Sequence, residues 1–190
     1  MTSPSPSFTP IKTIVLTGMM GAGKTCIGCK LAERLGLPFM DADSHIAEAA
    51  GRSVSEIFER HGEEVFRDSE RRVIARLLDE PVHVLAIGGG AFTDPETRAL
   101  ISQKALSVWL RADIELLLRR VLRRNTRPLL KTGDPREILE KLMEERYSAY
   151  AQANIIVDSA DAAPEVTVGK TYEALAAYIK GNSQESRKVS

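Results

Sequence analysis

One segment constrains this chain more than any other: residues 18–25 read Gly-Met-Met-Gly-Ala-Gly-Lys-Thr, a full match to the pattern G-x-x-x-x-G-K-[ST]. A β-branched run, residues 14–17, precedes the match and a helical pattern follows it, which is the strand–loop–helix context that this pattern requires. Glycines let successive backbone N–H groups face one point, where the helix N-terminus adds partial positive charge. Residues 18–25, the phosphate loop, therefore predict a polyphosphate site.

Each position of the phosphate loop has an expected partner on a nucleoside triphosphate. The Lys24 ammonium is expected to bridge the β- and γ-phosphates, and the Thr25 hydroxyl to bind the Mg²⁺ that joins them. Cys26, in the first helical turn, is placed to add a further backbone N–H. The residues expected to hold ATP here are Gly21, Ala22, Gly23, Lys24, Thr25 and Cys26. Motors, switches and kinases share such a loop, so the rest of the site must separate them.

The hydrophobic pattern predicts an α/β fold. Five short apolar runs alternate with helical patterns, as in a parallel sheet covered on both faces by helices. The runs are 12–17, 37–41, 82–87, 105–110 and 154–157. We therefore expect a three-layer α/β/α sandwich with a five-stranded parallel sheet. A capping box at Ser53 predicts a helix start there, and Gly62 is expected to interrupt that helix.

Size and charge exclude several functional classes. The 190 residues carry 26 basic and 26 acidic side chains, so nothing indicates broad attraction to nucleic acid or an anionic membrane. No run approaches the roughly 20 apolar residues of a membrane helix, and the N-terminus lacks the pattern of a secretory signal. We expect a cytoplasmic monomer with one domain at 11–180, a disordered leader at 1–10 and a disordered tail at 181–190.

Cys26 and Cys29 form a C-x-x-C pattern, which is typical of redox or zinc sites. A zinc site needs four ligands, and the three histidines show no paired spacing that would complete one. We therefore interpret both cysteines as small residues that pack a helix against the sheet.

Two carboxylates, Asp41 and Asp43, follow the second predicted strand. Strand alternation would direct both side chains to one side, at the sheet edge that carries the phosphate loop. One acid could then hold Mg²⁺ while the other orients an attacking alcohol. The alternative is that Asp43 only caps the helix that begins at Ser44.

Two further features indicate a small acidic substrate. Glycines 88, 89 and 90, the triple-glycine loop, follow the third strand and would let a ligand approach the main chain, although a plain turn is the alternative. Arg67 and Glu70 are one helical turn apart, so Glu70 can fix the guanidinium for binding a carboxylate. A surface ion pair is the alternative for these two residues.

An arginine-rich stretch, 111–133, ends in the loop 125–133, which has the composition of a mobile lid. A solvated charged face is the alternative for most of these arginines. A last helix is expected over about 164–180.

In combination, these motifs resemble the shikimate kinase family over about residues 11–179. The resemblance rests on the phosphate loop, Asp41-Ala42-Asp43, Phe66-Arg67 with Glu70, the triple-glycine loop, Arg127-Pro128-Leu129-Leu130, and Glu145-Arg146 with Tyr150. It implies a P-loop kinase that transfers the γ-phosphate of ATP to the 3-hydroxyl of shikimate. It also implies a substrate-binding region at about 41–70.

The resemblance assigns the remaining roles. Asp43 would contact the ring hydroxyls, Arg67 and Arg146 the carboxylate, and Gly89 the ring; Gly88 and Gly90 flank that contact. Asp41 would support Mg²⁺ with Thr25, and the lid residue Arg127 would stabilise the γ-phosphate during transfer, together with Lys24 and Asp43. An arginine before the lid would cover the adenine, and the residues leave four for this role: Arg119, Arg120, Arg123 and Arg124.

Two other functions remain open at this point. Gluconate kinases resemble the same fold and also phosphorylate a carboxylated polyol, but the combination of Arg67, Arg146 and the triple-glycine loop favours a ring acid. A non-catalytic nucleotide-binding module would need neither the paired acids nor two arginines for a carboxylate.

Overall fold

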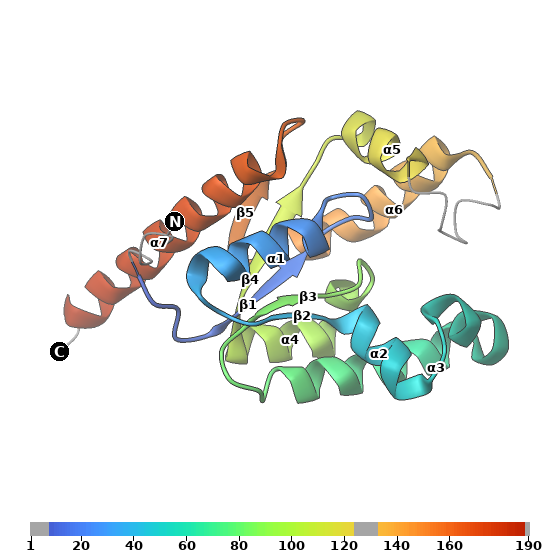
Figure 1. The fold of residues 1–190 in the computed structure, drawn as a ribbon, viewed down its shortest axis with the longest axis horizontal. Helices are drawn as coiled ribbons and strands as arrows, with labels where there is room; N and C mark the ends of the chain where they lie inside the picture. Colours follow the sequence, from blue (N-terminus) through green and yellow to red (C-terminus); the bar gives the residue numbers. More distant parts are fainter. Residues whose placement is uncertain (1–7, 124–132, 189–190) are drawn as a thin grey trace.

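A five-stranded parallel sheet forms the centre of the molecule (Figure 1). The computed structural model describes residues 8–123 and 133–188. The strands are β1 (Thr13–Thr17), β2 (Phe39–Asp41), β3 (Val84–Ala86), β4 (Ala105–Arg111) and β5 (Ile155–Asp158). Their order across the sheet is β2-β3-β1-β4-β5. The expected α/β class and all five expected strands are confirmed.

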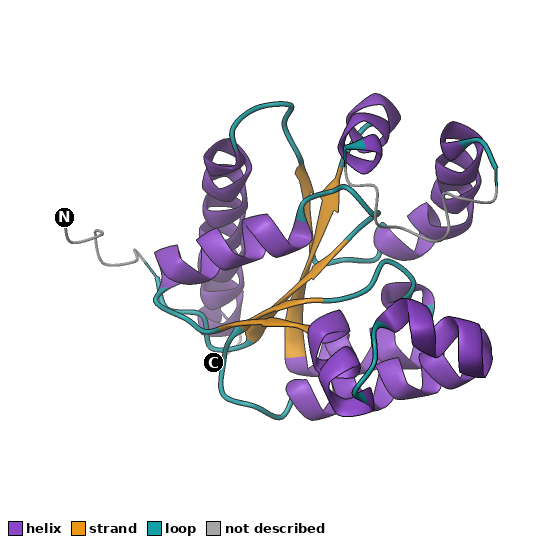
Figure 2. Cartoon of the chain, turned by 45° about the vertical axis from the view of Figure 1, so that its right-hand side comes forward, coloured by secondary structure: helices purple, strands orange, loops and turns teal. Residues whose placement is uncertain are grey.

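Helices cover both faces of the sheet, which gives the expected three layers (Figure 2). The helices are α1 (Lys24–Leu35), α2 (Ala42–Ala50), α3 (Val54–Leu77), α4 (Pro95–Lys104), α5 (Ile114–Leu122), α6 (Pro135–Tyr150) and α7 (Pro164–Lys188), with a 3₁₀ turn η1 (Ala91–Thr93). Helix α1 packs against α7 on one side, while α3 packs against α4 and α2 on the other. Within the described ranges, no helix has both the length and the apolar content needed to cross a bilayer.

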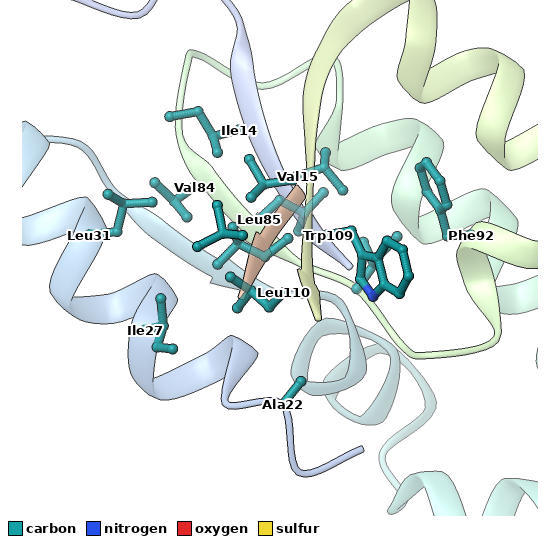
Figure 3. Packing of buried hydrophobic residues seen from close by; sticks show 14 of the residues in the cluster. Ile14, Val15, Ala22, Ile27, Leu31, Val84, Leu85, Phe92, Trp109 and Leu110 are labelled. Atoms are coloured by element: carbon teal, nitrogen blue, oxygen red, sulfur yellow. The ribbon is translucent and has the colours of Figure 1, made fainter. Parts of the chain in front are cut away.

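The core explains why the central strands are almost entirely apolar. Ile14, Val15 and Leu16 of β1 and Leu85 of β3 are completely buried, because helices cover both faces of these strands (Figure 3). The apolar face of α1, including Leu31, packs on the same strands. This core holds the strand ends rigidly, and the loops that follow those ends are the ones that carry the predicted site residues.

Helix α3 begins as its capping box predicts. The Ser53 hydroxyl accepts a hydrogen bond from the Glu56 backbone N–H at 3.2 Å, and the Glu56 carboxylate accepts one from the Ser53 N–H at 2.9 Å. Gly62, with φ 80° and ψ 174°, kinks the helix, which confirms the expected interruption. Both sides of the kink pack on α2, because Ile57 before it and Phe66 after it form one small cluster with Ile46.

The C-terminal helix differs from the sequence expectation. Helix α7 extends to Lys188, beyond the predicted end near residue 180 and into the stretch whose polar composition predicts a disordered tail. A single glycine, Gly181, costs a helix only about 1 kcal/mol, and the Gln, Glu, Arg and Lys residues after it are good helix formers.

Candidate active site

The phosphate loop lies between β1 and α1, as predicted, and leaves the start of α1 open for a ligand. Gly18 has φ 138°, and a β-carbon there would lie 2.6 Å from the Leu110 carbonyl oxygen of β4. Gly23 precedes α1 in the left-handed conformation, with φ 98°, and provides no side-chain cap. Helices α2 to α6 each have a side-chain cap, provided by Asp41, Ser53, Asp94, Asp113 and Asp134. The first turn of α1 therefore has no side-chain cap, and an anion can take that place.

The Lys24 ammonium lies against the phosphate loop itself. It donates hydrogen bonds to the carbonyl oxygens of Gly18, at 2.8 Å, and Met19, at 3.2 Å. A phosphate oxygen seated on the loop could replace one of these carbonyl oxygens as the acceptor. Lys24 is thus already positioned at the point where polyphosphate is expected.

Thr25 and Asp41 meet at the wall of the same cavity. The Thr25 hydroxyl donates a hydrogen bond to Asp41 Oδ2 at 3.0 Å, while Asp41 Oδ1 accepts from the backbone N–H groups of Asp43, at 3.1 Å, and Ser44, at 3.4 Å. Asp41 is therefore the cap of α2. The alternative in which Asp43 caps a helix beginning at Ser44 is wrong, because the helix already starts at Ala42.

The donor set at this point fits Mg²⁺ only if a ligand completes it. Thr25 and Asp41 supply two hard oxygen donors of the type that Mg²⁺ prefers. No cluster of three His, Cys, Asp or Glu side chains suited to a metal occurs in the part of the chain that the structure describes. Mg²⁺ commonly binds through one or two protein oxygens together with substrate phosphates, and this arrangement matches that mode.

Asp43 reaches the cavity by a different route from the predicted one. Strand β2 ends at Asp41, so Asp43 lies in the first turn of α2 rather than on an extended strand. Its Oδ1 nevertheless lies near the triple-glycine loop, 3.3 Å from where a methyl group on Gly88 would be. Asp41 and Asp43 both line the cavity, so the expected pair of acids is present although strand alternation does not produce it.

The triple-glycine loop leaves room for a different polar group at each glycine. A methyl group on Gly88 would lie 2.5 Å from Glu70 Oε1, and one on Gly89 would lie 3.0 Å from Arg146 Nη1. A methyl group on Gly90 would overlap the Arg67 guanidinium. Any side chain in this loop would displace one of these charged groups, so the loop is not a plain turn.

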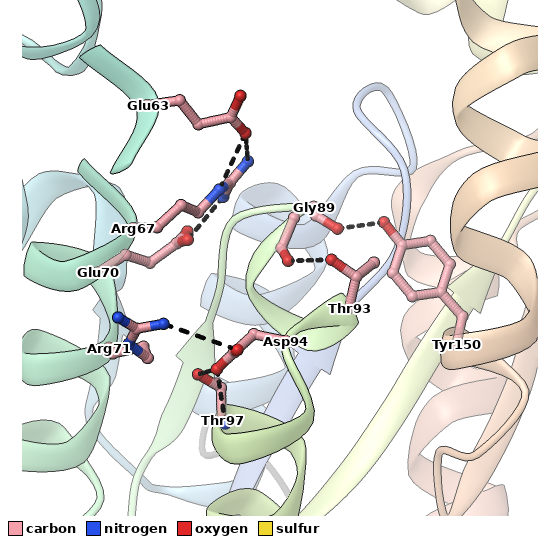
Figure 4. A network of polar contacts seen from close by, with 10 residues as sticks. Glu63, Arg67, Glu70, Arg71, Gly89, Thr93, Asp94, Thr97 and Tyr150 are labelled. Atoms are coloured by element: carbon pink, nitrogen blue, oxygen red, sulfur yellow. Dashed lines mark hydrogen bonds and ion pairs between the residues drawn. The ribbon is translucent and has the colours of Figure 1, made fainter. Parts of the chain in front are cut away.

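An ion-pair network holds Arg67 (Figure 4). Arg67 Nη1 donates to Glu70 Oε2 at 2.6 Å, and Arg67 Nε and Nη2 approach Glu63 Oε1 at 3.3 and 3.2 Å. The Glu70 side chain is only 2% exposed, so the alternative of a surface ion pair is wrong. Burial alone would lower the Arg67 pKa, but Glu70 and Glu63 outweigh that effect and raise it. Arg67 therefore stays a fixed cation.

The same burial acts on Glu70 in the opposite sense. Loss of solvent raises the pKa of the Glu70 carboxyl, and Asp43 adds to the rise, while Arg67 and Arg146 oppose it. Its Oε1 has no hydrogen-bond partner within the described residues and lies against Gly88. One carboxylate oxygen thus orients Arg67 while the other faces the triple-glycine loop.

Helix α6 brings a second guanidinium to this loop from another direction. Arg146 lies against Gly89, and Tyr150, one turn later, donates its hydroxyl proton to the Gly89 carbonyl oxygen at 2.5 Å. Burial raises the pKa of Tyr150 to about 12, partly opposed by Arg146, so the hydroxyl remains a donor at neutral pH. The sequence motif contains Tyr150 but indicates no role for it.

A single cavity of about 330 Å³ connects the two sets of residues. Its wall includes Lys24 and Thr25 from the phosphate loop, Asp43 from α2, and Gly88 and Gly89 from the triple-glycine loop. The two arginines do not line this cavity themselves; Arg146 lies against Gly89, which lines it, and Arg67 lies against the adjacent Gly90. The fold therefore places an anion site of the polyphosphate type beside a cationic site suited to a carboxylate.

Of the four arginines that the sequence leaves open for the adenine, the structure favours Arg120. Its guanidinium lines the cavity and donates to Ser159 Oγ at 3.0 Å and to the Ala160 carbonyl at 2.9 Å, beside the phosphate loop. Arg119 instead pairs with Asp161 at the surface, and Arg123 is an exposed residue at the cavity wall. Arg124 and the predicted lid residue Arg127 lie outside the described residues.

The packing interpretation of the two cysteines is wrong. Ile27, Gly28 and Leu31 occupy the buried face of α1, and a methyl group on Gly28 would overlap the Phe39 ring of β2. Cys29 is exposed, and Cys26 is half-buried at the cavity wall. The helical register, rather than residue size, decides which side chains face the sheet.

Comparisons with known proteins agree with this geometry. The family model for shikimate kinase matches residues 20–176. A shikimate kinase from Paramagnetospirillum magneticum is 58% identical over 168 residues, which cover 88% of this chain and 86% of the relative. One from Caulobacter vibrioides is 59% identical over 164 residues, which cover 86% of this chain and 82% of the relative.

Solved structures show the same pattern. A shikimate kinase from Acinetobacter baumannii in complex with shikimate superposes with a TM-score of 0.85 at 35% identity, covering 90% of this chain and 96% of that one. A gluconokinase from Sinorhizobium meliloti superposes with a TM-score of 0.67 at 18% identity, covering 94% and 99%. At 18% identity the second likeness concerns the fold alone.

Proposed function

The chain belongs to the shikimate kinase family, and on that premise we propose how its cavity transfers the γ-phosphate of ATP to the 3-hydroxyl of shikimate. It is an ATP-dependent phosphotransferase with an alcohol as acceptor. Phosphoryl transfer needs in-line positioning and neutralised oxygens more than covalent help from the protein. Each residue role below is therefore a role in positioning or in charge neutralisation.

The phosphate loop and Lys24 bind the triphosphate. The phosphate loop and the uncapped first turn of α1 would provide N–H donors from residues 21–26. Lys24 would exchange one of its bonds to a carbonyl oxygen for bonds to the β- and γ-phosphate oxygens. Thr25 and Asp41 would hold Mg²⁺ together with those oxygens; the ion would neutralise charge on the phosphates. Arg120 stands beside the loop where the adenine would extend.

The part of the site that binds the acidic substrate, here called the acid side, selects the acceptor. It consists of Asp43, Arg67, Arg146 and the triple-glycine loop. Arg67 and Arg146 would bind the carboxylate of shikimate from two directions, and the triple-glycine loop would lie along its ring. Asp43 would accept a hydrogen bond from the attacking hydroxyl and orient it toward the γ-phosphate. Arg127, whose role rests on the resemblance of its motif, would add positive charge to the γ-phosphate.

One observation carries this proposal: two guanidinium groups from different helices lie against one glycine loop, and that loop shares a cavity with the phosphate loop. A non-catalytic nucleotide-binding module has no need of the second site. A gluconate kinase would need a site for an open chain rather than a ring.

An ADP-release assay tests the proposal directly. The full chain with ATP and Mg²⁺ should turn over with shikimate and remain near background with gluconate or with no acceptor. Turnover with gluconate alone would replace the proposed acceptor. ADP or ATP binding without turnover on either acid would favour the non-catalytic module.

Assembly is a separate expectation. The sequence shows no heptad repeat and no apolar stripe that would indicate a partner chain. We therefore expect a cytoplasmic monomer that binds only ATP and shikimate. Light scattering coupled to gel filtration would measure the mass in solution against the 20.9 kDa of one chain.

A further inference from the structure

The C-x-x-C pattern on α1 remains unexplained by packing, zinc binding or the kinase reaction. Cys26 lines the cavity beside Thr25, and Cys29 is exposed one helical turn later. Neither cysteine belongs to a metal-binding cluster of described residues. The pair therefore consists of two reachable thiols, one of which forms part of the wall where we place ATP.

The spacing of the two cysteines allows a bond between them at a cost to the helix. Residues three apart in an α-helix have Cα atoms about 5 Å apart, which falls within the range found across disulfides. Their Cβ atoms are about 5–6 Å apart in a regular helix, whereas a disulfide needs about 3.8 Å. Closing the bond must therefore distort the first turns of α1, and that helix begins with Lys24 and Thr25.

We propose that Cys26 and Cys29 are an oxidation-sensitive thiol pair, and that their oxidation by a peroxide and the binding of nucleotide at the phosphate loop exclude each other. The second half of this proposal rests on the function proposed above. Bound nucleotide would cover the Cys26 side of the cavity, and oxidation would deform the turn that holds the phosphates.

The chemistry balances in two steps. The Cys26 thiolate attacks one oxygen of the peroxide, the O–O bond breaks, and after protonation the products are a sulfenic acid and water (or the alcohol of an organic peroxide). Cys29 then attacks the Cys26 sulfur, and the sulfenic hydroxyl leaves as water with the Cys29 proton. The two sulfurs lose two electrons in total, and the peroxide gains them.

The two steps balance in the same way whether Cys26 or Cys29 is oxidised first. Cys26 stands at the cavity wall and Cys29 is exposed to solvent, so a peroxide can reach either sulfur. A strained disulfide is also easily reduced, so a dithiol should restore the enzyme.

Mass spectrometry and nucleotide titration on the full chain test this proposal without any need for turnover. Peroxide-treated protein should lose the mass of two hydrogen atoms, mapped to the peptide that contains both cysteines. Its dissociation constant for ADP should rise by more than about tenfold and return after treatment with dithiothreitol. Excess ADP during the treatment should prevent the change.

Two variants separate the roles of the sulfurs. Cys29→Ser should stop at the sulfenic acid, which a cyclic dione traps at Cys26. Cys26→Ser should show the same ADP affinity before and after peroxide, each sample being compared with its own reduced form. Circular dichroism would confirm that both variants fold.

Three results would overturn the proposal: no disulfide in peroxide-treated wild type, equal ADP affinity of the oxidised and reduced protein, or oxidation that ADP does not slow. These results are distinct from failure of the proposed kinase activity. Reduced protein that binds ADP but does not phosphorylate shikimate would contradict the proposed function and leave the thiol pair intact.

Discussion

The phosphate loop and the acid side of the cavity hold their ligand groups by different means. The phosphate loop is one continuous segment whose contacts come mainly from the main chain, shaped by glycines such as Gly18 and Gly23. The acid side combines α3, α6 and the triple-glycine loop, and its contacts come from charged side chains. Substitutions in the phosphate loop should therefore change the nucleotide affinity and kcat, whereas substitutions on the acid side should change only the affinity for the acidic substrate.

The largest effect is expected for Lys24→Met, which removes the phosphate loop's cation. We expect kcat to fall about 10³-fold, by analogy with loss of one group that stabilises transition-state charge. Steady-state kinetics would measure this loss, and calorimetry should show unchanged shikimate affinity. Lys30→Met is the matched control on α1, because Lys30 pairs with Glu165 at the surface. Equal loss in both variants would point to damage of the helix.

Arg67→Ala should produce the complementary result on the acid side. We expect the KM for shikimate to rise about 10²-fold, since charge-assisted hydrogen bonds contribute about 1.5–3 kcal/mol each, while ATP binding is unchanged. Arg72→Ala is the control, because Arg72 is 78% exposed on the same helix. Parallel loss of affinity for ATP and shikimate would mean that the two regions are not separable.

Gly90→Ala sharpens the comparison without removing any charge. The added methyl group would overlap the Arg67 guanidinium, which can move because it ends a flexible side chain. We expect the KM for shikimate to rise about tenfold and the thermal midpoint to change little, because the backbone is not strained. Gly181→Ala, which meets nothing within 4 Å, is the control for KM; its thermal midpoint should rise slightly, because alanine is a better helix former than glycine. A large fall in the thermal midpoint with unchanged KM would contradict this account.

The smallest effect is expected for Asp94, which caps α4 just after the 3₁₀ turn that follows the triple-glycine loop. Burial alone would raise the Asp94 pKa, but its hydrogen bonds from Thr97 and the cations Arg71 and Arg98 outweigh that effect and lower it. An acid whose folded pKa is lowered stabilises the protein above its unfolded pKa, near 4, and loses that contribution as the pH falls through the folded value. Asp94→Asn keeps the cap acceptor and should flatten this part of the acid-unfolding curve.

Urea unfolding at several acidic pH values would measure the difference, which we expect to be at most about 1 kcal/mol. The nucleotide affinity of Asp94→Asn should equal that of the wild type at neutral pH, because Asp94 accepts hydrogen bonds from Thr97 and does not line the cavity. If the free energy of unfolding of Asp94→Asn fell with pH as steeply as that of the wild type, Asp94 would not titrate in this range.

Local sequence patterns predicted a structural feature correctly where one short segment forms all of that feature. The phosphate loop, the Ser53 capping box and the kink at Gly62 are confirmed, because each depends on residues within one turn of each other. The Arg67–Glu70 pair belongs to the same class, since helix geometry alone brings residues three apart together.

Predictions failed or stayed open where a contact depends on distant segments. Strand alternation did not show that β2 ends at Asp41, because the cap of α2 forms there instead. Residue size did not show that Cys29 faces solvent, because the register of α1 on the sheet sets that orientation. The choice of Arg120 over Arg119 needed the loop after β5, 39 residues away at Ser159.

The sequence by itself determined that this chain has a parallel α/β fold with a phosphate loop, because hydrophobic period, glycine placement and helix caps are local properties of the chain. The kinase activity was implied by the resemblance of its combined motifs to a known family. Only the tertiary structure decided that Arg67 and Arg146 face the same glycine loop, that Tyr150 holds Gly89, and that Cys26 borders the cavity. These contacts join α1, α3, α6 and the sheet edge. Their geometry depends on how the elements pack, which no single segment specifies.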